Sequence, residues 1–168
     1  MFSLAHRASK LTSRPYIPAL EEHTARQGCL DHASFSCLHS TLPDYLQDPV
    51  LFLYLSGWRV SEMRALEWRD VDLEGQVVRL RPEISKNKDA RVLPLHGELL
   101  DLIQRATRPR RLDCPFVFHC NGRPIGDFHK AWTKACREAG LGAIIVHDLR
   151  RTAVRNMPRA RRNEPQWS

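Results

Sequence analysis

Apolar residues recur at three- and four-residue spacing in several stretches of the chain, which is the pattern of a helix with one buried face. The strongest pattern begins at Leu42-Pro43-Asp44, runs through apolar residues to Leu55 and is ended by Gly57. A further helix begins at His147, with Leu149, Ala153 and Val154 expected to pack inward, and weaker helical patterns cover residues 19–22, 32–42, 61–66, 96–103 and 128–139. The pattern predicts a mainly helical protein.

Two short runs rich in β-branched residues predict strands. They are Gln76–Leu80 and Arg91–Leu95, and a polar connection that carries Lys86 and Lys88 joins them. This arrangement indicates an antiparallel pair. A third apolar run at residues 116–119 predicts a short buried strand or extended segment. The predicted fold class is therefore α+β, mainly α, with a small antiparallel β-sheet.

A chain of 168 residues with 42% hydrophobic content can bury one ordinary core. We divide it into a disordered start at residues 1–13, a linker and helical lead-in at 14–40, a globular domain at 41–157 and an irregular tail at 158–168. The linker is indicated by Pro15 and Pro18. The tail contains two prolines and few apolar residues, so we expect that it cannot continue a buried helix.

The formal net charge of +7 favours a polyanionic partner. Nucleic acid is the commonest polyanionic partner, although ribosomal proteins and proteins that bind membrane surfaces also carry a net positive charge. Residues 1–56 carry four basic and five acidic side chains, so residues 57–168 carry a net charge of +8 (22 basic minus 14 acidic). The basic excess thus lies in the part of the chain that contains the candidate site.

The five cysteines are an odd number without regular spacing, and the chain starts without a secretory signal pattern. We therefore expect reduced thiols and a cytoplasmic protein. The set Cys114, His119, Cys120 and His129 fits none of the usual zinc spacings, so no metal or other cofactor is predicted. The longest apolar run is far shorter than the roughly twenty residues that span a bilayer, so no membrane partner is expected either.

Candidate chemistry begins with His147 and Arg150, which share a helix face because they are three residues apart. Together they can meet one phosphate, the arginine as a bidentate clamp and the histidine as a proton carrier near neutral pH. Arg59 adds a second guanidinium from a short turn between two predicted helices, a rigid mount for a catalytic group. Two plainer interpretations stay open: surface helices often carry basic residues, and Arg59 can simply pair with Glu62.

Taken together, the motifs resemble the catalytic domain of the tyrosine recombinases, the phage integrase family. The resemblance covers about residues 14–157 and is most specific in Leu55-Ser-Gly-Trp-Arg59-Val-Ser-Glu62, Leu66-Glu-Trp68-Arg-Asp70-Val-Asp72 and His147-Asp-Leu-Arg150-Arg-Thr-Ala153. It implies a helical catalytic domain with a small antiparallel sheet that cleaves and rejoins double-stranded DNA, in company with other recombinase subunits and without a small-molecule substrate.

The resemblance also implies roles for individual residues. Arg59 and Arg150 would clamp one scissile phosphate, and His147 would act as an acid/base partner. Lys86 would deliver a proton to the leaving 5′-oxygen, whereas Lys88 is expected to be a solvated loop residue. A tyrosine near the C-terminus would be the nucleophile.

This chain departs from the family pattern because no tyrosine follows Arg150. Its only tyrosines are Tyr16, Tyr45 and Tyr54. A frameshift or premature stop in a decaying mobile element is the simplest account. Three hypotheses follow: a recombinase fragment that is inactive alone unless another subunit donates a tyrosine, a non-catalytic DNA-binding protein, or a degenerate remnant of a mobile element.

Overall fold

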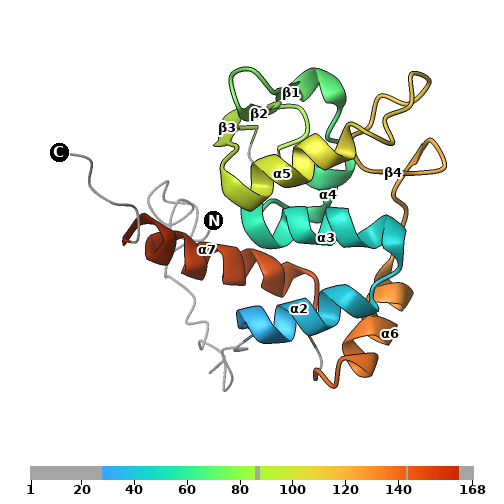
Figure 1. The fold of residues 1–168 in the computed structure, drawn as a ribbon, viewed down its shortest axis with the longest axis vertical. Coiled ribbons are helices and arrows are strands. Elements are labelled where there is room, and N and C mark those ends of the chain that lie inside the picture. The colour runs from blue at the N-terminus through green and yellow to red at the C-terminus, as the bar shows by residue number, and fades with distance from the viewer. Residues whose placement is uncertain (1–27, 86–87, 143, 163–168) are drawn as a thin grey trace, which may run out of the picture.

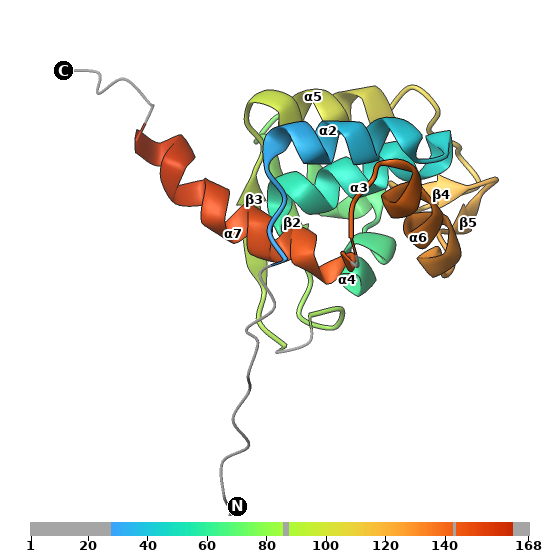
Figure 2. The same ribbon diagram turned by 90° about the horizontal axis from the view of Figure 1, so that it is seen from below.

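The computed structural model describes residues 28–85, 88–142 and 144–162, and their arrangement is shown in Figures 1 and 2. The helices are α2 (His32–Thr41), α3 (Asp44–Ser56), α4 (Val60–Arg64), the 3₁₀ helix η1 (Trp68–Asp70), α5 (Gly97–Ala106), α6 (His129–Glu138) and α7 (His147–Arg162). The strands are β1 (Val71–Asp72), β2 (Val77–Leu80), β3 (Arg91–Pro94), β4 (His119–Cys120) and β5 (Arg123–Pro124). The predicted class, α+β and mainly α, is confirmed.

Helix α3 is the centre of the fold: it lies between α5 on one side and α2 and α7 on the other, and α4 follows it (Figure 1). Eight of its 13 residues are buried. It begins after Pro43, as predicted. It ends where Gly57 adopts a left-handed conformation with φ of 66° and donates its N–H to the carbonyl of Leu53 at 3.0 Å, a helix ending that suits glycine.

The predicted antiparallel pair of strands is also confirmed. In the three-stranded sheet, β2 lies between β1 and β3, and Val78 of β2 faces Leu93 of β3. Val78 and Leu80 are buried in the core. Lys88, near the end of the connection between β2 and β3, is exposed, as expected.

Two further predictions are confirmed. Helix α6 buries the apolar stripe that contains Trp132, Ala135 and Cys136. Residues 115–117 form an extended segment that pairs with residues 66–68 through two backbone hydrogen bonds, from Trp68 N to Pro115 O at 2.9 Å and from Val117 N to Leu66 O at 2.9 Å. These contacts fix the chain between the sheet and α6.

The C-terminal helix differs from the prediction in two ways. Residues 158–162 were expected to be irregular, but α7 continues through Pro158 to Arg162. A proline removes one amide donor, while the Arg-Ala-Arg-Arg segment that follows consists of strong helix formers. Val154 was expected to pack inward and is 58% exposed. Among the residues of α7 whose side chains are described, the buried positions are 148, 149, 152 and 153, so position 154 lies beyond the edge of this stripe.

The core also begins earlier than the predicted domain boundary at residue 41. Leu30, Phe35 and Leu38 belong to the single hydrophobic core, and α2 packs against α3 and α6. The predicted disordered start at 1–13, most of the linker, the short helix at 19–22 and residues 163–168 lie outside the described residues. Within the described ranges, every helix is too short or too polar to cross a bilayer.

Candidate active site

Arg59 occupies the turn between α3 and α4, as the sequence predicted. It is the residue before the first turn of α4, with extended backbone angles (φ −79°, ψ 151°). Its backbone N–H donates to Glu62 Oε2 at 2.9 Å, and its side-chain Nη1 donates to Glu62 Oε1 at 2.9 Å. The two bonds hold both the main chain and the guanidinium of Arg59, which keeps 26% of its side chain exposed.

The Glu62 carboxylate is the buried centre of this arrangement, with a side chain that is 0% exposed. Burial by itself raises the pKa of Glu62, but the hydrogen bonds from Arg59 and the charge of Arg91 outweigh it, so the pKa lies below its ordinary value. Glu62 therefore stays ionised at neutral pH. The expectation that it pairs with Arg59 is confirmed.

Arg150 reaches the same place from α7. Its Nη1 donates to the carbonyl oxygen of Gly57 at 2.7 Å, two residues before Arg59. Burial lowers the pKa of Arg150, the charges of Arg59 and Arg91 lower it further, and Glu62 opposes them. Arg59 and Arg150, 91 residues apart in the sequence, thus lie within electrostatic reach of each other.

A third arginine, Arg91, was not among the predicted site residues. It is the first residue of β3, and its Nη2 donates to Glu62 Oε1 at 2.8 Å. Its Nε is shielded from solvent and has no partner among the described residues. Nothing local in the sequence marks Arg91, because its partner is 29 residues away on another element.

His147 is the first residue of α7 and is exposed, one helical turn before Arg150. Its ring makes no hydrogen bond to the described residues. The next residue, Asp148, caps this end of the helix by accepting the Ile145 N–H at 3.0 Å. Arg151, which follows Arg150, forms an ion pair with Asp148 at 3.6 Å. Lys86, the predicted acid, lies outside the described residues.

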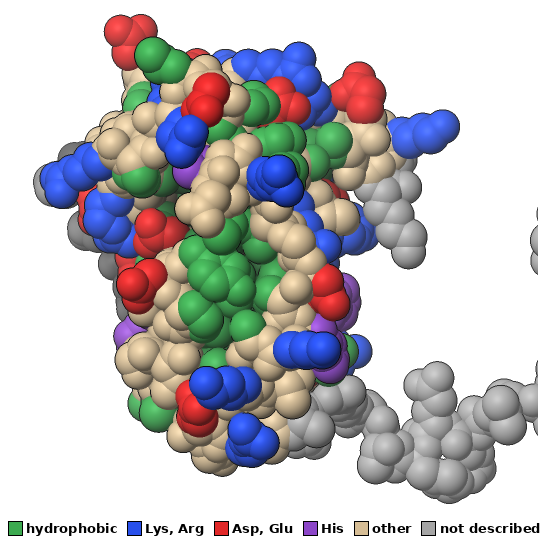
Figure 3. All heavy atoms as spheres, turned by 90° about the vertical axis from the view of Figure 1, so that its right-hand side faces the viewer, with side chains coloured by type: hydrophobic (Ala, Val, Ile, Leu, Met, Phe, Trp, Pro, Cys, Tyr) green, Lys and Arg blue, Asp and Glu red, His purple; other side chains and the backbone are tan. Residues whose placement is uncertain are grey.

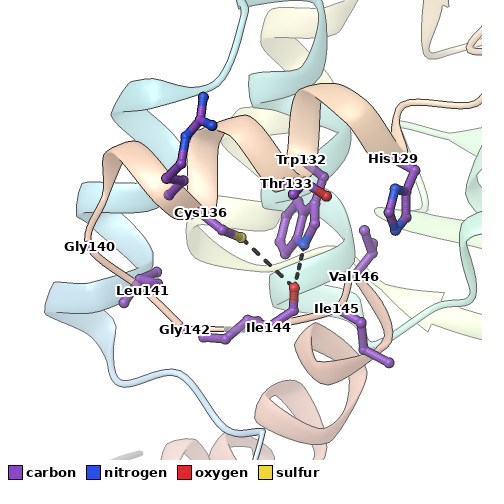
Figure 4. Close-up of a pocket in the computed structure, with 11 residues that line it drawn as sticks. His129, Trp132, Thr133, Cys136, Gly140, Leu141, Gly142, Ile144, Ile145 and Val146 are labelled. Carbon is purple, nitrogen blue, oxygen red and sulfur yellow. Dashed lines mark hydrogen bonds between the residues drawn. The ribbon is translucent and has the colours of Figure 1, made fainter.

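Two sets of contacts hold α7 in position. On one side Thr152 Oγ1 accepts the buried N–H of Leu30 at 3.0 Å, and Arg155 donates to the Leu30 carbonyl at 3.0 Å. On the other side the indole N–H of Trp132 in α6 donates to the carbonyl of Ile144 at 2.8 Å, three residues before His147 (Figure 4). These contacts fix the helix that carries His147 and Arg150 against the core.

Helix α6 and the residues that follow it also line an open, mainly apolar pocket of about 490 Å³ (Figure 4). Trp132 and Cys136 line it from α6, and Ile144 lines it from the segment before α7. Its lining is mainly apolar, with His129 and Arg137 among its polar residues. Among the described residues no group of three or more histidine, cysteine or acidic side chains is placed to hold a metal ion. The candidate site is therefore the group formed by Arg59, Arg91, Arg150 and Glu62.

Of the three tyrosines, two are described. Tyr54 is 6% exposed, and its ring stacks on Phe35 with centroids 3.6 Å apart. Burial raises the pKa of the Tyr54 hydroxyl, which keeps it protonated. Tyr45 is 43% exposed and lies in the first turn of α3, the end far from Gly57. Tyr16 lies outside the described residues.

We call Arg59, Arg91, Arg150 and Glu62 the arginine cluster. It brings three guanidinium groups around one carboxylate, a net charge of +2. Its partly exposed guanidiniums can bind an oxyanion by charge-assisted hydrogen bonds.

The face of the molecule shown in Figure 3 has a different character from the arginine cluster. A hydrophobic patch lies at its centre, and side chains of both charge signs surround the patch.

Comparison with known proteins gives consistent results. A family model described as "Phage integrase family" matches residues 20–164. The tyrosine recombinase XerC of Roseiflexus sp. (strain RS-1) is 31% identical over 133 residues, which cover 71% of this chain and 42% of the relative. The integrase of Salmonella phage P22 is 27% identical over 130 residues, covering 66% of this chain and 33% of the relative. The chain thus spans well under half the length of these relatives.

Solved structures show the same fold. The Tn1549 transposon integrase in complex with circular intermediate DNA matches with a TM-score of 0.71 at 18% identity, covering 98% of this chain and 64% of the other. A lambda integrase in a tetramer bound to a Holliday junction matches with a TM-score of 0.70 at 16% identity, covering 92% and 49%.

Proposed function

Because this chain belongs to the phage integrase family, we propose that it supplies the phosphate-binding part of a site that cleaves and rejoins DNA strands in site-specific recombination. The observation that carries the proposal is the assembly of Arg59 and Arg150 at one place, through the bond from Arg150 to the Gly57 carbonyl. Double-stranded DNA is the proposed partner, together with further recombinase subunits. Since DNA is the substrate and the five cysteines are free thiols, we place the protein in the cytoplasm.

The proposed chemistry is transesterification at a DNA phosphate. Arg59 and Arg150 bind the two non-bridging oxygens and stabilise the added charge of the pentacoordinate transition state, each contributing about 3 kcal/mol by analogy with a lost oxyanion donor. Lys86 gives its proton to the leaving 5′-oxygen, and His147 exchanges a proton with the attacking group. The exposed position of His147 suits this role.

The nucleophile is a tyrosine hydroxyl that attacks phosphorus as the bond to the 5′-oxygen breaks, leaving a 3′-phosphotyrosyl bond that preserves the energy for rejoining. In our proposal this tyrosine comes from polypeptide outside the 168 residues. Tyr54 is buried and Tyr45 lies at the far end of α3, so neither is suited to the role.

A second candidate function, not favoured over the first, is that of a DNA-binding protein that occupies phosphates without cutting. Both functions predict salt-dependent binding to duplex DNA with little sequence preference, because the groups address phosphates. Fluorescence anisotropy with a labelled duplex should show affinity falling steeply between low and physiological salt. An affinity that is flat over this range contradicts both functions.

Two variants localise the binding. Arg150→Ala should weaken binding to all sequences and reduce the slope of log affinity against log salt by about one phosphate contact. The control is Arg105→Ala, which removes an equally charged, half-exposed side chain from α5 whose ion pair within the described part of the chain is with Asp48. If both variants behave alike, the arginine cluster is not the phosphate site.

A covalent-adduct assay separates the two functions. The chain is incubated with a nicked suicide duplex, alone and with an intact tyrosine recombinase whose own Arg150 counterpart is mutated. Our proposal expects no adduct from the chain alone and an adduct in the mixture. An adduct from the chain alone that disappears with Tyr16→Phe would show that the chain carries its own nucleophile.

A further inference from the structure

The two oxygens of the Glu62 carboxylate accept hydrogen bonds from different donors. Oε2 accepts the backbone N–H of Arg59, whereas Oε1 is shared by Arg59 Nη1 at 2.9 Å and Arg91 Nη2 at 2.8 Å. The two guanidiniums therefore meet at a single oxygen atom that is fully shielded from solvent. A shift of Glu62 would move both.

Arg91 restrains Glu62 from a different element of the fold than Arg59 does. Arg59 and Glu62 are three residues apart at the start of the short helix α4, so they move with the same element. Arg91 belongs to β3, which is held by its ladder with β2. The contact at Oε1 therefore ties α4 to the sheet, and without it the Arg59–Glu62 pair keeps only its local hydrogen bonds.

The position of Arg91 in the chain adds a second consequence. It is the first residue of β3 and ends the connection that begins after Leu80 and contains Lys86. The same Arg91 contact that restrains Glu62 therefore fixes the end of this connection beside Arg59. The 38% exposed fraction of its side chain shows that Arg91 is at the edge of the cluster and not part of the core.

We propose that Arg91 is a positioning residue of the arginine cluster: through the shared Oε1 of Glu62 it fixes the guanidinium of Arg59 and ties the start of β3 to it. The effect of Arg91 on DNA binding rests on the proposed function. The geometric part, restraint of Arg59 by Arg91, stands without DNA.

The geometric part is tested on the free protein by nitrogen-edited NMR of the arginine guanidinium N–H groups, with Arg59→Ala to assign the signals. Loss of the restraint in Arg91→Ala should accelerate exchange of the Arg59 N–H groups with water about fivefold, a coupling within the range for residues of one hydrogen-bonded network. The matched control is Arg79→Ala, which removes an exposed arginine from the neighbouring strand β2 and should leave the exchange unchanged. Equal exchange in Arg91→Ala and wild type overturns the proposal.

If Arg91→Ala does not fold in a thermal melt, Arg91→Gln serves as the second variant, because it removes the charge but keeps a donor. It should accelerate the exchange at least twofold, and unchanged exchange in a folded Arg91→Gln protein overturns the proposal in the same way. Arg91→Lys, which can still donate to Oε1, should remain within about twofold of wild type.

The DNA part is tested by a double-mutant cycle with a random-sequence duplex. If Arg91 acts through Arg59, Arg91→Ala should weaken binding about fivefold in the wild type and less than twofold in the Arg59→Ala background. Equal weakening in both backgrounds shows a direct phosphate contact and overturns the positioning role. Wild-type protein that fails to bind DNA contradicts the proposed function instead, and the NMR experiment then decides the role of Arg91.

Discussion

Replacing Glu62 by glutamine tests whether the arginine cluster depends on a buried charge. A glutamine side chain has nearly the same shape as a glutamate, so the substitution removes the charge with little change in packing. The carbonyl oxygen of the amide can take the place of Oε1 and still accept from Arg59 and Arg91. The amide nitrogen then takes the place of Oε2 and faces the backbone N–H of Arg59, a donor against a donor.

The magnitude follows from these contacts. Losing one partner of a buried ion pair costs about 3–5 kcal/mol. Glu62 is fully buried, but Arg59 and Arg91 are 26% and 38% exposed, so water compensates part of the loss on their side. We therefore expect the lower end, about 3 kcal/mol of unfolding free energy. For a protein of this size that corresponds to a melting temperature lower by about 6–12 °C.

Urea denaturation of wild type and Glu62→Gln at pH 7 measures this difference. Asp48→Asn is the matched control, since Asp48 pairs with Arg105 at 3.3 Å and both side chains are nearly half exposed. Its loss should cost less than about 0.5 kcal/mol. If Glu62→Gln is as stable as Asp48→Asn, the buried carboxylate does not hold the cluster together and the reasoning is wrong.

The same pair of proteins has a defined pH dependence. The pKa of Glu62 in the folded protein lies below its ordinary value of 4.5, so its charge stabilises the fold fully above pH 4.5 and loses this effect as pH falls through the folded-state pKa. The stability difference between wild type and Glu62→Gln should therefore shrink in acid. A difference that grows as the pH falls below 4.5 would contradict the sign of the shift.

Three further predictions concern other contacts. Thr152→Val should cost about 1.5 kcal/mol in urea denaturation because it leaves the buried N–H of Leu30 without an acceptor, whereas Thr133→Val on the exposed side of α6 should be nearly neutral. Gly57→Ala should lower the unfolding free energy by about 1 kcal/mol, because a side chain at φ of 66° is strained. Phosphate, compared with chloride at equal ionic strength, should raise the melting temperature of wild type more than that of Arg150→Ala; an equal rise in both would place the anion elsewhere.

The parts of the fold that the sequence predicted well are those with strong local signals. Pro43 and Gly57 mark the ends of α3 because both residues act on the backbone next to them. Helix α6 was also predicted, since Phe128, Trp132, Cys136 and Ala139 recur at three- and four-residue spacing. The start of the core was missed because α2 is weakly amphipathic, so its packing through Phe35 and Leu38 depends on neighbours distant in sequence.

The candidate site likewise contains residues that local motifs predict and one residue that they do not. Arg59, His147 and Arg150 stand in motifs that mark them, and the structure brings Arg59 and Arg150 together. Arg91 has no such mark, because the contact with Glu62 depends on how the sheet packs against α4. The roles of all these residues, and that of Lys86, stay predictions until the binding and adduct assays are done.

The charges of the arginine cluster bear on the proposed binding of a phosphate. Arg59 and Arg91 share the Glu62 carboxylate, and Arg150 lies within electrostatic reach of both. Burial lowers the pKa of Arg150, and the like charges of Arg59 and Arg91 lower it further, whereas Glu62 raises it. In our proposal a phosphate placed among the exposed guanidinium N–H groups offsets this repulsion, because each arginine then gains a counter-charge. The excess positive charge of the cluster is, in this proposal, what favours the bound phosphate.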